Sequence, residues 1–157
     1  MTRYLLFLFL FSSALQAENL IDNGDFESGR KDWKGDRDIE YETDAETNKV
    51  LYFEVDDKPQ EIEQEFDAED YRVFTVTYRV RATDDYQGLG YQIRFVRDSG
   101  SSTFYDRSVK AGADWKKEKI TYKAVKDSDD LKLRITVIDD DDGEGAILFD
   151  DVVLTAK

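Results

Sequence analysis

Apolar and polar residues alternate along most of this chain in short runs, a period of two that indicates half-buried β-strands. The clearest run is 71–82, whose two faces are Phe74, Val76, Tyr78 and Val80 against Thr75, Thr77, Arg79 and Arg81. Weaker or shorter alternation marks 50–55, 61–66, 89–96, 101–109, 118–125 and 131–138. No window of helical length carries a sustained apolar stripe, so we expect at most a turn or two of helix.

Segments rich in Gly, Asp, Asn and Ser separate these runs, for example at 84–88, 98–102 and 111–114. Short strands at regular spacing with turns between them predict an antiparallel β-sandwich or barrel. In run 89–96 the predicted core residues are Leu89, Tyr91, Ile93 and Phe95. Since no internal repeat is visible, we expect residues 18–157 to form one domain.

The first 17 residues have a different pattern. Arg3 precedes an unbroken apolar run at 4–11, and small and polar residues follow up to Ala17. This is the order of a secretory signal peptide, and the apolar run is too short to span a bilayer. We predict cleavage after Ala17, with Ala14 as the second choice, and a secreted or periplasmic product.

Composition narrows the function. The chain has 36 acidic and 22 basic residues and a net charge of −14, which argues against nucleic acid and anionic lipid as partners. It has neither His nor Cys, and we find no nucleophile elbow or phosphate-binding loop, so we expect a protein that is not an enzyme. A carboxylate pair would be uninformative among so many acids.

Carboxylates also occupy both ends of the predicted domain, in strand-like runs at 19–29 and 147–154. The first run carries Asp25 and Glu27, and the second carries Asp150 and Asp151. A carboxylate in a half-buried strand needs a partner. The two acidic ends are therefore candidates to share a cation.

Four separated patterns resemble the carbohydrate-binding modules of families 4, 9 and 22. They are Asn19-Leu20-Ile21-x-Asn23-Gly24-Asp25-Phe26-Glu27-x-Gly29 with Trp33, Gln64-x-Phe66 before the run 71–82, Trp115 before Ile120-Thr121-Tyr122, and Gly145-x-Ile147-x-Phe149-Asp150-Asp151-Val152-x-Leu154. The resemblance implies an all-β, antiparallel jelly-roll β-sandwich of the galactose-binding-like type. It also implies a secreted, non-catalytic domain that binds a polysaccharide or oligosaccharide.

The same resemblance implies a structural Ca²⁺ ion, with Glu27 and Asp150 supplying side chains and with Gly24 or Asp25 and a residue in the middle of the chain adding oxygens. Calcium prefers about six to eight hard oxygen ligands, which carboxylates and backbone carbonyls provide. The alternative is that acids such as Asp25 and Asp151 are turn or edge residues in water.

Family binding sites lie on the outer face of one sheet or in loops at the edge, where aromatic rings stack on sugars. The candidate rings are Tyr41, Tyr52, Tyr86 and Tyr105, whereas Trp33 and Trp115 match framework positions. Outward cations form a second candidate set with Gln92: Arg79, Arg81, Arg94, Lys119, Lys123, Lys132 and Arg134. Collected on one face, they would favour an anionic polysaccharide. The alternative is cross-strand pairing with Glu61, Glu63 and Glu65.

A different class of function also stays open. The same sandwich serves as an extracellular or envelope structural module that contacts other proteins, and a large exposed apolar patch would favour that interpretation. In either case we expect a monomer with no membrane span.

Overall fold

The computed structural model describes residues 18–36, 40–43, 48–55, 58–68, 71–97, 99–112, 114–124, 130–138 and 143–157, and of 40–43 the backbone alone. The predicted signal peptide lies outside these residues. Within them the strands are β1 (Lys34–Gly35), β2 (Glu40–Thr43), β3 (Lys49–Glu54), β4 (Gln60–Asp67), β5 (Val73–Ala82), β6 (Gly90–Arg97), β7 (Ser102–Arg107), β8 (Lys116–Lys123), β9 (Asp130–Ile138) and β10 (Ala146–Ala156). None of the described residues belongs to a helix able to cross a membrane.

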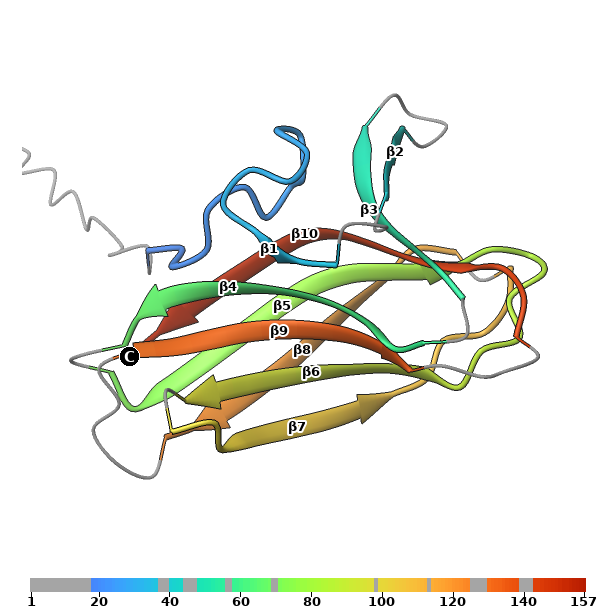
Figure 1. Ribbon diagram of the computed structural model, residues 1–157. Coiled ribbons are helices and arrows are strands. Elements are labelled where there is room, and N and C mark those ends of the chain that lie inside the picture. The colour runs from blue at the N-terminus through green and yellow to red at the C-terminus, as the bar shows by residue number, and fades with distance from the viewer. Residues whose placement is uncertain are drawn as a thin grey trace, which may run out of the picture.

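The strands form two five-stranded antiparallel sheets. Sheet A has the order β1-β4-β9-β6-β7, and sheet B has the order β2-β3-β10-β5-β8. Figure 1 shows sheet A stacked in front of β10, β5 and β8, with β2 and β3 rising from sheet B at the top. The predicted all-β antiparallel sandwich is confirmed.

Aromatic rings fill the space between the sheets. The inward residues of β5 are each 2% exposed or less, as the alternation predicts. Phe95 stacks on Tyr122 with centroids 4.5 Å apart, and Tyr91 meets Phe149 edge to face at 5.0 Å. The hydroxyls of Tyr78 and Tyr91 lie 3.1 Å apart, and burial raises the pKa of Tyr78 to about 12. Both phenols therefore stay neutral and satisfy each other inside the core.

The prediction that Leu89 belongs to the core is wrong. Leu89 is 61% exposed, because β6 begins one residue later at Gly90. Gly90 has φ +116°, and a Cβ there would lie 2.2 Å from the carbonyl oxygen of Arg107. The chain thus turns into the sheet at a position that only glycine fits, and Leu89 remains outside it.

The N-terminal segment takes the place of β3 beside the second half of β10. β3 pairs with β10 only over residues 146–149, and beyond them Leu20 N–H donates to the Leu154 carbonyl at 2.7 Å. Val152 N–H likewise donates to the Gly24 carbonyl at 2.8 Å, next to an irregularity in β10 where Asp151 has φ +50°. The two acidic ends of the domain therefore lie side by side.

Gln64 ties this segment to the opposite sheet. Its side chain points from β4 toward the interior and is 6% exposed. Gln64 Oε1 accepts from Asp22 N–H at 2.7 Å, and Gln64 Nε2 donates to the Asp22 carbonyl at 2.9 Å. One amide thus satisfies both backbone groups of Asp22 and links the segment beside β10 to sheet A.

Replacing this amide should destabilise the fold. We expect Gln64→Leu to lower the free energy of unfolding by about 1–3 kcal/mol, because it leaves both backbone groups of Asp22 without their partner. Urea denaturation measures the change. The matched control is Gln60→Leu in the same strand, where Gln60 is 8% exposed and its Oε1 has no partner within the described residues. Equal losses from the two variants would contradict the proposed role of Gln64.

Candidate functional site

A row of side chains crosses the outer face of sheet A. In the strand registers Phe104 of β7 lies opposite Arg94 of β6, Arg94 opposite Arg134 of β9, and Arg134 opposite Glu63 of β4. The alternation of each strand turns all four away from the core. Phe104 is 54% exposed, and the Arg94 guanidinium carbon lies 6.0 Å from its ring centroid. The row thus begins with an aromatic ring open to solvent.

Arg94 is held by polar neighbours on the same face. Its Nε donates to Gln92 Oε1 at 2.8 Å, and Gln92 Nε2 donates to Asp106 Oδ1 at 2.6 Å. In the part of the chain that the structure describes, no carboxylate pairs with Arg94. The guanidinium therefore lies beside the exposed ring without an ion-pair partner among these residues.

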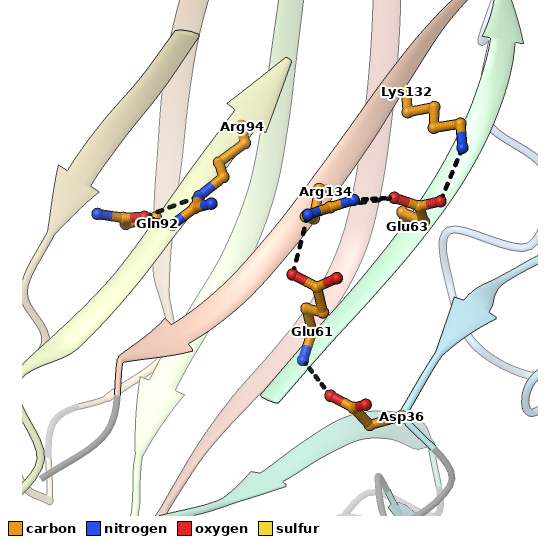
Figure 2. A network of polar contacts seen from close by, with 7 residues as sticks. All are labelled: Asp36, Glu61, Glu63, Gln92, Arg94, Lys132 and Arg134. Carbon is orange, nitrogen blue, oxygen red and sulfur yellow. Dashed lines mark hydrogen bonds and ion pairs between the residues drawn. The ribbon is translucent and has the colours of Figure 1, made fainter. Parts of the chain in front are cut away.

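Arg134 has a different environment, which Figure 2 shows as a separate network. It donates to Glu61 Oε2 and, through Nε, to Glu63 Oε2, each at 3.0 Å, while Lys132 Nζ lies 3.0 Å from Glu63 Oε1. Asp36 accepts from the backbone N–H of Glu61 at 2.9 Å and extends the network to the sheet edge. The cross-strand pairing alternative is confirmed for Lys132 and Arg134.

The network fixes the charge state of Glu63. Burial opposes its charged form, but the hydrogen bonds and charges of Arg134 and Lys132 outweigh burial and lower the pKa of Glu63 below its ordinary value. The same contact raises the pKa of Lys132. Glu63 and Lys132 are therefore both ionised at neutral pH, and their opposite charges neutralise each other.

The outward cations do not gather on one face, because β5 and β6 belong to different sheets. Arg79 and Arg81 lie on the outer face of sheet B, opposite the face that carries Arg94 and Arg134. Arg79 Nη1 lies 3.5 Å from Asp150 Oδ2 and 3.4 Å from Asp151 Oδ2. It neutralises the acidic end of the domain and is separated from the candidate row.

Two predicted tyrosine platforms also need correction. Tyr86 is 6% exposed, and Gly88 makes room for its ring, since a Cβ there would lie 2.8 Å from the ring. Tyr105 faces inward, packs edge to face against Phe95, and its hydroxyl donates to the Thr121 carbonyl at 3.3 Å. The neighbouring Phe104 takes the outward position, so the ring that sequence reasoning missed is one residue away from a predicted one.

The other two tyrosines stay predictions. Tyr52 is half-buried in β3 on the outer side of sheet B, opposite Leu148 in the register. Tyr41 belongs to β2, whose side chains lie outside the description. Neither residue joins Arg94 and Gln92 on sheet A.

Two of the predicted calcium ligands, Asp150 and Glu27, contact the start of β3. Asp150 is 1% exposed, and it accepts from Asp151 N–H at 2.7 Å and from Asn48 Nδ2 at 2.8 Å. Burial raises the pKa of this carboxyl. Glu27 is exposed and its Oε1 accepts from Lys49 N–H at 2.9 Å, so both acids contact the consecutive residues 48 and 49.

Gly24 and Asp25 are already engaged. The Gly24 carbonyl accepts from Val152, and Asp25 Oδ1 accepts from the backbone N–H of Glu27 at 3.3 Å. Among the described residues, no three acidic, His or Cys side chains gather as a metal-binding group. Any ion here would depend on two carboxylates together with backbone oxygens.

Comparison with known proteins identifies the fold. No family model and no curated protein matches the sequence. A family 61 carbohydrate-binding module in complex with β-1,4-galactotriose aligns with a TM-score of 0.70 and 17% identity, over 90% of this chain and 100% of the other. The CBM22-1 xylan-binding domain from Paenibacillus barcinonensis Xyn10C aligns with a TM-score of 0.59 and 12% identity, over 89% and 95%.

Similar structures also occur inside larger enzymes. An exo-β-agarase aligns with a TM-score of 0.64 and 10% identity over 89% of this chain, but over only 25% of the enzyme. At these identities the likeness establishes the fold alone. The chain has the jelly-roll sandwich of carbohydrate-binding modules, as the sequence patterns predicted.

The Glu63 network predicts a pH dependence. Because the folded-state pKa of Glu63 lies below its ordinary value of 4.5, its contribution to stability is complete above that pH and is lost as the pH falls through the folded-state pKa. We therefore expect Glu63→Gln to be less stable than the wild type at neutral pH and the gap to narrow below pH 4.5. Thermal unfolding at several pH values measures the gap.

Glu65→Gln is the control for this prediction. Glu65 lies on the same face of β4, is exposed, and forms no ion pair within the described residues. A similar pH-dependent gap for both variants would mean that the network around Glu63 has no special effect.

Proposed function

We propose that this protein binds a polysaccharide through the outer face of β6 and β7. The observation that carries the proposal is the exposed ring of Phe104, in register with Arg94, a guanidinium that pairs with no carboxylate among the described residues. Sugar rings have apolar faces that stack on aromatics and hydroxyls that bond polar groups. Phe104 supplies the first kind of contact, and Gln92, Arg94 and Asp106 supply the second.

The charge balance of this face favours a neutral glycan. Arg134 and Lys132 are neutralised by Glu61 and Glu63, so a preference for an anionic polysaccharide would depend on Arg94. A uronate carboxylate beside Arg94 would also approach Asp106, which bonds to Gln92. Repulsion between these carboxylates opposes an anionic ligand.

We also propose that the mature protein acts outside the cytoplasm as a monomeric, non-catalytic binder. The leader-like residues 1–17 and the lack of His and Cys support this view. The alternative of a protein-contact module has no specific support, because the large apolar residues that are exposed in the described part of the chain lie apart from one another: Leu89 before β6, Phe104 in β7 of sheet A and Val153 in β10 of sheet B.

Calcium stays part of the proposal. Asp150 is a nearly fully buried carboxylate that bonds to Asn48, and Glu27 bonds to the backbone of the next residue, Lys49. Two carboxylates and nearby carbonyls are the hard oxygen donors that Ca²⁺ requires. Glu27 and Asp150 would hold the ion, which would add positive charge between the two acidic ends of the domain and brace them.

Phe104→Ala should weaken glycan binding. Loss of a central stacking ring typically costs about 2 kcal/mol, or roughly 30-fold in Kd. We expect Arg94→Gln to weaken binding less, because it removes the charge and keeps a polar side chain. Calorimetry with the best ligand from a glycan array that includes galactans, xylans, uronates and sulfated glycans measures both effects.

Leu89→Ala is the matched control, since it removes an exposed apolar side chain at the end of the same sheet. It should bind like the wild type. Unchanged affinity in Phe104→Ala, or binding by none of the glycans on the array, would refute the proposed site.

The calcium proposal predicts a thermal shift. We expect Ca²⁺ to raise the Tm over an EGTA-treated sample by about 5 °C or more, because a ligand that binds only the folded state stabilises it. Glu27→Gln should abolish the shift, whereas Asp32→Asn, an exposed acid in the same segment, should retain it. Identical melting curves with Ca²⁺ and with EGTA would remove the ion from the account.

A further inference from the structure

The end of the sandwich where β5 finishes and β8 begins carries a second aromatic ring joined to guanidinium groups. Trp115 is half-buried, and the guanidinium carbons of Arg79 and Arg81 lie 4.7 Å and 5.2 Å from its ring centroid. Both arginines project from the outer face of β5. This end lies at the right of Figure 1, on the sheet opposite Phe104.

Trp115 stands between two hollows. One, of about 410 Å³, is lined by Arg81, Thr83, Asp84, Gly112 and Asp114 together with Trp115. The other, of about 510 Å³, lies on the side of Val80, Val109 and Lys116 and is more apolar. Ligand sites of small molecules have volumes in this range.

The first hollow brings together polar groups that do not bond one another. Arg79 is paired with Asp150 and Asp151, but Arg81 forms no ion pair within the described residues and its Nε is buried without an acceptor. Asp84 and Asp114 are exposed and line the same hollow, yet neither is within ion-pair distance of Arg81. Ligand hydroxyls placed between them can accept from the guanidinium and donate to the carboxylates.

Two loops hold this hollow in shape. Gly112 N–H donates to the Thr83 carbonyl at 2.9 Å and ties residues 108–112 to the end of β5. Gly112 has φ +62°, and a Cβ there would lie 2.8 Å from Asp84 Oδ1. The left-handed backbone conformation favours glycine at this position, and the hydrogen bond to Thr83 holds the two loops together beside the hollow.

We propose that Trp115, Arg81, Asp84 and Asp114 form a second glycan subsite, on the opposite side of the sandwich from Phe104. The chemistry repeats that of the first site, with an aromatic ring, a guanidinium without a carboxylate partner, and carboxylate acceptors. The subsite rests on the proposed function for its class of ligand. Since its ring lies against Arg79 and Arg81 on the outer face of the other sheet, one molecule can hold two glycan chains and bridge them.

Tryptophan fluorescence separates the two subsites. The chain has two tryptophans, and Trp33 is 3% exposed, so Trp33→Phe leaves Trp115 as the only reporter. In this variant we expect β-1,4-galactotriose or xylotriose to shift the emission and reduce quenching by acrylamide. The signal should persist when Phe104→Ala is added, and it should weaken at least roughly tenfold in apparent Kd in Asp84→Asn/Asp114→Asn.

Bridging is tested with the full chain and a soluble polysaccharide of the type that binds. The wild type should raise the turbidity of the solution, and Trp115→Ala should abolish turbidity while retaining calorimetric binding at the Phe104 face. A melting curve shows whether Trp115→Ala is folded, and the double asparagine variant, which removes no packing, repeats the test.

The outcomes distinguish the two proposals. Binding that depends on Phe104, with one glycan per protein and no change in Trp115 emission, overturns the second subsite and leaves the first. A Trp115 signal without any effect of Phe104→Ala on affinity supports the subsite and overturns the Phe104 site. An unchanged Trp115 emission together with no binding by any glycan on the array overturns both.

Discussion

The position of β10 between β3 and β5 is the constraint on which the rest of the structure depends. β10 is the last strand of the chain, yet it lies in the middle of sheet B and pairs with β3 in its first half, with β5 along its length, and with the N-terminal segment in its second half. Sheet B is therefore continuous only because β10 lies between β3 and β5, and the N-terminal segment pairs with β10; we call this arrangement the β10 closure. Gln64 extends this closure to sheet A through Asp22.

This closure brings acids into poorly solvated places, and arginines compensate them. Asp150 is buried on β10 beside Arg79, and Glu63 is half-buried on β4 beside Arg134. A buried carboxylate without a partner is costly, so these two arginines are committed to the fold. Arg94 and Arg81 form no ion pair among the described residues, and each lies against an aromatic ring. The net charge of −14 hides this division between structural and available cations.

Strands and faces were predictable from the sequence because alternation reports burial directly. The inward residues of β5 follow the predicted parity, and the two acidic ends meet as expected. Strand order leaves no trace in alternation, so the separation of Arg79 from Arg94 was not predictable. Parity also fails where a strand is short or exposed at an edge. In β7 both faces carry an aromatic residue. Tyr105 rather than Phe104 faces the core because its ring packs against Phe95 of β6, and the local pattern of β7 does not show this contact.

The two proposed subsites differ in how rigidly their groups are held, and this difference bears on what each can recognise. Phe104 and Arg94 are placed by a register of strand pairs, and the Asp106–Gln92 bond orients the guanidinium. Groups fixed on strands present a flat row that fits an extended stretch of a chain. Trp115 instead lies at the end of a loop beside a hollow with walls, which fits a unit that can enter it. A flat face and a walled hollow on opposite sheets therefore select different parts of a glycan. Both subsites consist of outward side chains and loops, so a substitution that creates or removes one of them leaves the pairing of β10 with β3 and β5 in place.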